Sequence, residues 1–476
     1  MALALLVGAG CRGPASSAPA VDAAAPPPPG APGPDFAGAP PGMPQMPTTA
    51  ETEYSAGIYV VDGRYVKDRS LAGLVYSGQV GDTSATGVRI ASDRDDLNAV
   101  LVRGKDTRYV LSDAVIELQG DGSNDFLGLG AGAMAEGGAE LTLRNVQITT
   151  NGVISNAVAS ITNGVVKVYD STLRANGGTL PADYVPKIGP GMKEAPAPLG
   201  IKGTARTVIT ANDSKSYFYN STIIAQGWGA LSTDAPGHSY LEANDSQVKV
   251  LDSGYGTYAD HNCTVVINRT KFDTPTYTAI VAGEGALTLN ESEADSRGNI
   301  VMVHSVMGRG PEIGHVNIHG GKYVSKEAAI LVKSANADIV VDGADIASGS
   351  GEFLKSVVND DSHATKVAGQ RVSGINATLK NATVAGDVIH GDGDRDLRLS
   401  LQDATLKGAV TGAQLRLDGK SKWTATADSR VTLLGPVELA QIDAPAGVVV
   451  QATAGEGNAL KHGDYPLAGG GKLRIE

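Results

Sequence analysis

Short runs of alternating apolar and polar residues fill the chain from about Ile58 onward. Segments such as "TRYVLSDAVIELQG", "AELTLRNVQITTNG" and "GVVKVYDSTLRANGG" place Val, Ile or Leu at every second position, and glycine or a polar turn ends each run. Alternation with a period of two is typical of strands that bury one face, and these runs lack helical spacing. The pattern therefore predicts an all-β protein built from many short strands.

The strands recur with a regular period. The segment "VYDSTLRANGG" (168–178) returns as "FYNSTIIAQGWG" (218–229), with a polar corner residue after the first strand of each. The corners are Asn145, Asp170, Asn220, Asn244, Asn268, Asn290, Asp342, Asn381 and Asp403. Their spacings of 25, 50, 24, 24, 22, 52, 39 and 22 residues indicate a period of 22–25. We interpret the 50 and the 52 as two periods each, while the 39 fits no whole number. Such a period without helical spacing is typical of a β-solenoid.

Stacking these periods gives a parallel β-coil. The inward residues of one coil pack on those of the next, and each strand finds hydrogen-bond partners above and below. Asn and Asp suit the corners because they tolerate left-handed backbone. We expect a parallel β-helix over residues 51–440 and a cap over 441–476. A proline-rich loop at 179–200, "TLPADYVPKIGPGMKEAPAPLG", interrupts it, either as a recognition element or as a tolerated insertion.

The coil spacing resembles that of the right-handed parallel β-helices of the pectate-lyase-like class, which also form autotransporter passenger domains. A closer match is "LRLDGKSKWTATADSRVTLLG" (415–435), similar to a stretch near the end of pertactin-like passengers. The matching residues are Leu415, Leu417, Ser421, Trp423, Thr426, Ser429, Val431 and Leu434. In that family the stretch closes the helix and promotes folding. No alternating strands of a translocator barrel follow "GGGKLRIE", so we expect attachment to a surface by other means.

The first 50 residues have a different composition. The run "MALALLVGAGC" (1–11) resembles a bacterial lipoprotein signal ending in its lipobox cysteine, Cys11. Residues 12–50 hold 12 of the 23 prolines, and such a segment behaves as an extended, disordered tether. We expect an exported lipoprotein anchored by lipid at Cys11, at the cell surface or facing the periplasm. The alternative is an ordinary N-terminus with a chance cysteine.

The net charge and the cysteine content limit which kinds of partner and of cross-link we expect. The net charge of −12 is spread along the chain without a block of Lys or Arg, so we expect no nucleic-acid partner and contact with a membrane only through the lipid. Two cysteines cannot form a disulfide framework, and Cys263 alternates with Val265 and Ile267 as an inward-facing core thiol would. We expect a monomer.

Aromatic residues concentrate in the middle of the chain. Nine of the 22 aromatic side chains (2 Trp, 15 Tyr and 5 Phe) lie between residues 217 and 277. Enzymes with the β-helix architecture bind polysaccharide on aromatic platforms, so this resemblance suggests ligand-binding residues here. The candidates are Trp228, Tyr217, Tyr219, Tyr258 and Tyr277.

The segment "GYGTYADHN" (254–262) supplies the catalytic candidates Tyr255, Asp260 and His261. It is partly similar to the Tyr-Gly-x-Asp-Pro-His signature of alginate C5-epimerases, although three residues separate Gly256 from Asp260 and no proline precedes His261. Tyr, Asp and His suit abstraction of a proton beside a carboxylate and its return on the opposite face. The alternative is one more structural corner.

The turn "HGDGDRD" (390–396) supplies calcium-site candidates, Asp392, Asp394 and Asp396, because carboxylates separated by glycine are common in calcium-binding turns. The alternative is a solvated turn, and we expect no other cofactor.

Two functions remain open. The leading hypothesis is an adhesin-like or structural β-helix that binds extracellular glycan or a surface protein. The alternative is a β-helix polysaccharide lyase or uronate C5-epimerase. An enzyme would need Tyr255, Asp260 and His261 to converge in a groove, whereas a structural corner would splay them.

Overall fold

A computed structural model describes residues 48–189, 191–305, 312–359 and 374–476. Pro47–Glu476 form one unit, and the fold below is that of its described residues. The expected signal segment 1–11 with Cys11, and the expected linker as far as residue 47, lie outside the described part of the chain.

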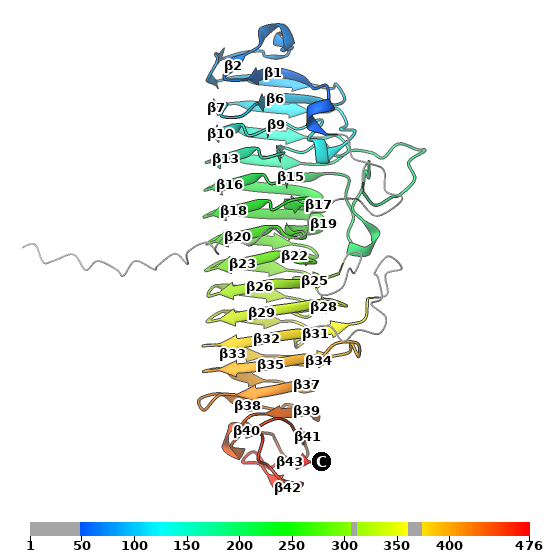
Figure 1. Cartoon of the computed structure of the whole chain (residues 1–476), viewed down its shortest axis with the longest axis vertical. Coiled ribbons are helices and arrows are strands. Elements are labelled where there is room, and N and C mark those ends of the chain that lie inside the picture. Colours follow the sequence, from blue (N-terminus) through cyan, green and yellow to red (C-terminus); the bar gives the residue numbers. More distant parts are fainter. Residues whose placement is uncertain (1–47, 190, 306–311, 360–373) are drawn as a thin grey trace, which may run out of the picture. The chain divides into compact units, whose positions relative to one another are not determined.

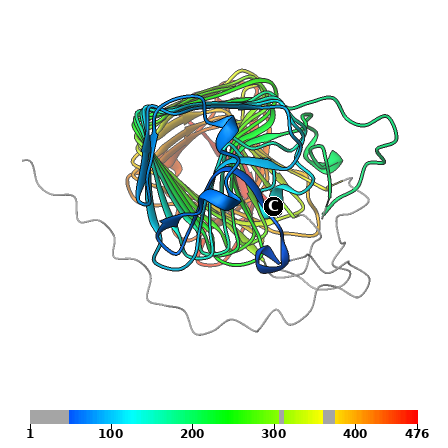
Figure 2. The same ribbon diagram turned by 90° about the horizontal axis from the view of Figure 1, so that it is seen from above.

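Parallel strands stack along one axis and wind around it, coil after coil (Figure 1). Viewed down this axis, the coils superimpose around a common interior (Figure 2). Each complete coil contributes one strand to each of three faces, which we call the first, second and third face in chain order. The all-β class and the parallel β-helix predicted from the sequence are confirmed.

The first face begins beside the N-terminal segment. In stacking order it consists of β1 (Ser55–Val61), β6 (Leu97–Arg103), β9 (Ala133–Glu136), β12 (Val158–Ile161), β15 (Arg206–Ala211), the second half of β17 (Thr222–Asp234), the second half of β19 (Gln247–Ala259), β22 (Tyr277–Ala282), β25 (Asn299–His304), β28 (Ile330–Lys333), β31 (Glu352–Val357), β34 (Asp387–His390) and the start of β37 (Val410–Leu417). From β9 to β25 nearly every residue is buried, on both sides of the sheet.

The second face carries alternating buried and partly exposed residues, so its outer side meets solvent. In stacking order it consists of β4 (Ser84–Thr86), β7 (Arg108–Ser112), β10 (Glu140–Arg144), β13 (Val165–Tyr169), β16 (Lys215–Tyr219), β18 (Tyr240–Asn244), β20 (Thr264–Asn268), β23 (Ala286–Asn290), β26 (Ile313–His319), β29 (Asn336–Asp342), β32 (Ile375–Lys380), β35 (Leu397–Gln402), the end of β37, β39 (Ser429–Leu434), β41 (Val449–Ala454) and β43 (Lys472–Ile475).

The third face is divided in two. Its first part consists of β5 (Arg89–Ser92), β8 (Val115–Leu118), β11 (Gln147–Thr150), β14 (Thr172–Ala175), the first halves of β17 and β19, β21 (Lys271–Thr274), β24 (Glu293–Ser296), β27 (Lys322–Ser325) and β30 (Asp345–Ser348). A separate sheet of β33 (Thr383–Ala385), β36 (Thr405–Lys407), β38 (Lys422–Thr424) and β40 (Ile442–Asp443) continues it.

The remaining elements are short. They are β2 (Arg64–Tyr65), β3 (Gln79–Val80), β42 (Gly463–Pro466) and the 3-10 helices η1 (Thr49–Glu51), η2 (Lys67–Arg69), η3 (Ala72–Leu74), η4 (Asp125–Leu127), η5 (Ala197–Leu199) and η6 (Leu439–Gln441). All three strands pair antiparallel with neighbours at the two ends of the coil.

Inward side chains form columns that run from coil to coil. On the first face, Val100, Ala133, Val158, Val208 and Leu231 occupy one column and are fully buried. Burying a Val or Leu side chain contributes roughly 1.5–3 kcal/mol, so a column stabilises every coil through its neighbours.

The corners between the second and third faces carry left-handed backbone. Five predicted corner residues adopt it, with φ between 47° and 51°: Asn145, Asp170, Asn220, Asn381 and Asp403. For Asn244, Asn268, Asn290 and Asp342 the prediction is wrong by one residue. These four end their strands, and the left-handed conformation falls on Asp245, Arg269, Glu291 and Gly343.

Three of these strand ends are joined by an amide ladder, those of Asn244, Asn268 and Asn290. The Nδ2 of Asn268 donates to Oδ1 of Asn244 at 2.8 Å, and the Nδ2 of Asn290 donates to Oδ1 of Asn268 at 2.8 Å. These asparagines therefore stabilise the stacking of coils, and other residue types make the turn.

The 50-residue spacing is a single coil with an insertion, so its interpretation as two periods is wrong. Tyr169 pairs with Tyr219, and Nδ2 of Asn220 donates to Oδ1 of Asp170 at 2.7 Å. The extra residues lie between β14 and β15, and we call them the 176–205 insertion. It projects from the coil in both views (Figures 1 and 2).

The other irregular spacings also have a structural account. Asp342 pairs with Lys380, so the 39-residue spacing is likewise one coil, and residues 360–373 within it lie outside the described part. The 52-residue spacing is two coils, as predicted, because His319 is in register with both Asn290 and Asp342.

The coil continues beyond residue 440 to the end of the chain. Strands β41 and β43 extend the second face, and β42 pairs antiparallel with β43. In the preceding coil, the Trp423 ring is fully buried and its Nε1 donates to the Gly408 carbonyl at 2.9 Å. The C-terminal segment therefore covers one edge of the last strand of the second face.

Candidate functional site

Side chains on the outer side of the first face lie beneath other parts of the chain. Near the N-terminus, the Tyr54 hydroxyl donates to the Leu127 carbonyl at 2.8 Å. Further along, the Trp228 amide donates to the Lys202 carbonyl at 2.7 Å, and the Lys202 amide donates to Oγ of Ser253 at 3.0 Å. The 176–205 insertion therefore covers the middle coils of this face.

A buried ionic cluster lies beneath these covering segments. The Arg206 side chain, 3% exposed, donates from Nη2 to Oδ2 of Asp125 at 2.6 Å and also pairs with Asp234. Its guanidinium carbon lies 5.3 Å from the Phe126 ring centre and 5.0 Å from that of Trp228. Arg206 thus links η4, β15 and β17 through charge and through cation–π contacts.

Proton affinities in this cluster are strongly shifted. Burial opposes the charge on Arg206, but the carboxylates of Asp125 and Asp234 outweigh it and raise the Arg206 pKa well above its usual value. Burial raises the pKa of Asp234 to about 7 and also raises that of Asp260, on the next coil. Three carboxylates share one buried cation, so a proton held on Asp234 or Asp260 reduces the excess negative charge.

The catalytic candidates belong to the same region but are engaged individually. Tyr255 is 1% exposed, and its hydroxyl lies 2.9 Å from Oγ of Ser232. The Asp260 Oδ2 accepts the Ala235 amide at 2.8 Å. The His261 Nδ1 lies 3.8 Å from Oε1 of Glu312.

The predicted ligand-binding aromatics divide between two environments. On the first face, Trp228 is 1% exposed, and Tyr258 and Tyr277 are each 9% exposed. The Tyr258 ring centre lies 5.2 Å from that of Tyr255, and burial raises the pKa values of both hydroxyls. Tyr217 and Tyr219 instead point outward from the second face and are only partly buried.

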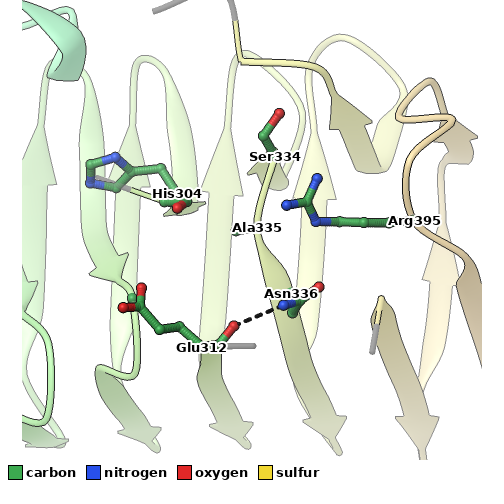
Figure 3. A pocket seen from close by; sticks show the side chains of 8 residues that line it. His304, Glu312, Ser334, Ala335, Asn336 and Arg395 are labelled. Atoms are coloured by element: carbon green, nitrogen blue, oxygen red, sulfur yellow. Dashed lines mark hydrogen bonds between the residues drawn. The ribbon is translucent and has the colours of Figure 1, made fainter. Parts of the chain in front are cut away.

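A small cavity lies further along the coil, at the corner between the first and second faces. His304, Glu312, Ser334, Asn336 and Arg395 surround it (Figure 3). Its volume is about 10 Å³, which corresponds to one water molecule. A sugar residue does not fit this cavity.

An open aromatic surface lies on the second face, over β13, β16 and β18. The rings of Tyr169 and Tyr219 stack with centres 4.8 Å apart at 9°, and those of Tyr217 and Tyr240 lie 5.7 Å apart at 45°. All four side chains are partly exposed. We call these four residues the tyrosine strip.

Neighbouring charged groups hold the tyrosine strip in place. The Arg144 guanidinium lies 4.4 Å from the Tyr169 ring centre, and the Tyr240 hydroxyl donates to Oε2 of Glu242 at 2.7 Å. Beside it, Lys167 Nζ and Glu140 Oε1 form a 2.9 Å ion pair. Rings fixed in this way lose little rotamer freedom on binding, so the strip is a preorganised surface with polar groups at its rim.

Sequence reasoning missed two members of the strip, Tyr169 and Tyr240. The signal was present, because "VYDST" and "FYNST" place Tyr169 and Tyr219 at the same position of the repeat. Because the 50-residue spacing was interpreted as two periods, Tyr169 and Tyr219 were expected to lie two coils apart, whereas they lie on adjacent coils.

The calcium candidates lie in the turn between β34 and β35. The Asp392 carboxylate is buried, pairs with Nη1 of Arg395 at 2.9 Å and accepts the Asp394 amide at 3.1 Å. Within the described ranges, the acidic, histidine and cysteine side chains form no group of three that could hold a metal ion.

Cys263 is fully buried, as expected for an inward-facing thiol, and burial raises its pKa to about 12.

No protein-family model matches the chain, and no curated protein is detectably similar to it. Among the helices of the described residues, none combines the length and apolar character needed to cross a membrane.

Proposed function

We propose that this protein is an adhesin-like β-helix that binds extracellular glycan through the tyrosine strip. The observation that carries the proposal is the arrangement of Tyr169, Tyr217, Tyr219 and Tyr240 on an uncovered sheet face. A tyrosine ring offers a flat apolar surface with a hydroxyl at its edge, which suits both the apolar face and the hydroxyl groups of a sugar. Tyr169 and Tyr219 stack in register on adjacent coils, and Tyr217 and Tyr240 form a second, tilted pair beside them.

The charges beside the rings favour a polar ligand. Glu242 accepts hydrogen bonds from the Tyr240 hydroxyl and from Nδ2 of Asn244, and Lys167 and Glu140 form a half-exposed pair. Hydroxyl groups of a sugar can add to these donors and acceptors without separating the ion pair. A surface protein remains the alternative partner.

A polysaccharide lyase or uronate C5-epimerase is the second proposal. It is supported by Asp234, whose pKa of about 7 would suit proton transfer near neutral pH, and by the raised pKa of the neighbouring Asp260. Against it stands the burial of Tyr255 and Tyr258, which gives a polymer no direct access to their hydroxyls.

We further propose that the protein is exported and anchored by lipid at Cys11, with the proline-rich residues 12–50 holding the β-helix away from the membrane. The support is the lipobox-like run "MALALLVGAGC" and the composition of the segment after it. Replacing Cys11 by Ser should move the protein from the membrane fraction to the soluble fraction. Unchanged fractionation would contradict the anchor.

The experiment that tests the function is a glycan array, including uronic-acid polymers, probed with the full chain, with products analysed by mass spectrometry. If the protein binds glycan without acting on it, particular glycans are retained with their mass and linkage unchanged. Cleavage or epimerisation would support the enzyme instead. Retention of no glycan would contradict the glycan proposal.

A further inference from the structure

A polar hollow lies where the 176–205 insertion rejoins the coil, at the corner between the third and first faces. Its volume is about 620 Å³, large enough for a sugar residue. Its lining comes from the two ends of the insertion and from two successive coils, through β17 and β19: Asn176, Lys202, Gly203, Thr204, Gln226, Gly227, Asp252 and Ser253. The hollow shares no residue with the tyrosine strip.

Backbone contacts fix the floor of the hollow. Gly203 has φ of 141°, and a Cβ there would lie 2.2 Å from the Trp228 nitrogen. A Cβ at Gly227 would lie 2.7 Å from the Lys202 carbonyl oxygen. Two glycines are therefore required for the insertion to approach β17 this closely, because a Cβ at either position would collide with the backbone of the facing segment.

Unusual backbone geometry adjoins this floor. Trp228 has φ of 59°, a left-handed conformation that is rare for a bulky residue. This conformation is held by the hydrogen bond from the Trp228 amide to the Lys202 carbonyl and by the contact of the Trp228 ring with Arg206. Such outliers persist where the surrounding structure over-determines them, and they cluster at binding sites.

The side chains of the hollow leave specific groups available. Gln226 donates to Oδ2 of Asp252 at 2.5 Å, and Oγ of Ser253 accepts the Lys202 amide. These bonds leave Oε1 of Gln226, Oδ1 of Asp252 and the Ser253 hydroxyl proton for a ligand. The Lys202 side chain is exposed and belongs to the lining, so its ammonium is accessible to a ligand in the hollow.

We propose that this hollow is a second binding site, which takes an anionic sugar residue. Carboxylate, amide and hydroxyl groups close together suit the hydroxyl groups of one sugar ring, and Lys202 would pair with a carboxylate or sulfate on the same ring. The site stands on its own residues and does not depend on glycan binding at the tyrosine strip.

The test is calorimetric titration of the full chain with two probes that differ in charge, a glucuronic-acid trisaccharide and the matching glucose trisaccharide. We expect tighter binding of the acidic probe. Lys202→Gln should weaken that binding roughly two- to fivefold, as expected for an exposed ion pair, and leave the neutral probe unaffected. Asp252→Asn should weaken both probes.

Lys249→Gln is the matched control. Lys249 is an exposed lysine on β19, the strand that carries Asp252 and Ser253, but it lies outside the hollow. Circular dichroism and thermal unfolding check that each variant folds. Equal binding of the two probes, equal effects of the two lysine variants, or no binding of either probe would overturn the proposal. Variants of Tyr217 and Tyr240 in the same titration separate this result from the tyrosine strip.

Discussion

Replacing Arg206 by Met removes the cation at the centre of the buried cluster and keeps a side chain of similar length. The Arg206 side chain is 3% exposed and that of Asp125 is 2% exposed, so the substitution leaves Asp125 and Asp234 as buried carboxylates without a cationic partner. The contacts of the guanidinium with Phe126 and Trp228 are lost as well.

Breaking a buried ion pair by removing one partner costs about 3–5 kcal/mol. We expect the Arg206→Met variant to lose stability in that range at pH 8. At pH 5 the loss should be smaller, because a buried carboxyl group without a cation takes up a proton more readily. A second change, Asp234→Asn, should recover part of the loss because it removes one of the unpaired charges.

Tryptophan fluorescence gives a local assay, because the chain contains two tryptophans, Trp228 and Trp423. Trp228 touches Arg206, and Trp423 lies in a C-terminal coil. In a Trp423→Phe background, urea unfolding followed by fluorescence reports the middle coils. This local probe matters because long repeat arrays do not always unfold as one unit.

A loss of stability below about 1 kcal/mol at pH 8, against the 3–5 kcal/mol expected, would contradict the role of Arg206 as the partner of two buried carboxylates. An equal loss at pH 5 and pH 8 would also refute it, because the cost would then not come from buried negative charge.

Other predictions concern pH, the C-terminal edge and one glycine. Because Asp234 has a pKa of about 7 in the fold and a lower one unfolded, stability should fall as pH rises from 5 to 7, by up to about 1.4 kcal/mol per pH unit, and should level off above pH 7. Urea midpoints for Asp234→Asn should show a flatter profile, and identical profiles would contradict this. Deleting 463–476 should expose the edge of β41 and cause concentration-dependent aggregation, seen by light scattering; a soluble, folded truncation would contradict it. Gly229→Ala should cost at least about 2 kcal/mol in thermal unfolding, because a Cβ would lie 2.0 Å from a Tyr255 ring carbon. Gly73→Ala, with open space, is its control, and equal effects would contradict the packing argument.

The architecture could be predicted because it follows from a pattern with a period of two. Val, Ile and Leu at alternate positions determine which side of each strand faces inward, and repetition of the pattern makes every coil pack like its neighbours. The corners could be placed only to within one residue. The reason is that an asparagine can either end a strand or make the turn. Asn244 ends its strand and accepts a hydrogen bond from the next coil, while Asp245 adopts the left-handed turn.

The insertion and the candidate sites were harder to predict. An excursion such as 176–205 leaves the register of flanking strands unchanged, so the spacing alone could not distinguish one coil with an insertion from two coils. Which aromatics are open and which are buried depends on what covers each face. The sequence grouped Trp228 with Tyr217, although the insertion lies over one and solvent reaches the other.

Glycan binding by the tyrosine strip can be measured by titration. A glycan retained on the array is titrated into the wild-type chain and into Tyr217→Ala, Tyr240→Ala and Tyr76→Ala. Tyr76 is the control because it is 65% exposed and lies away from the strip, after η3. We predict that each strip variant binds roughly 5- to 30-fold more weakly, as for loss of an aromatic hot spot, and that Tyr76→Ala binds as the wild type does. Folded strip variants that bind as tightly as the wild type would contradict the account.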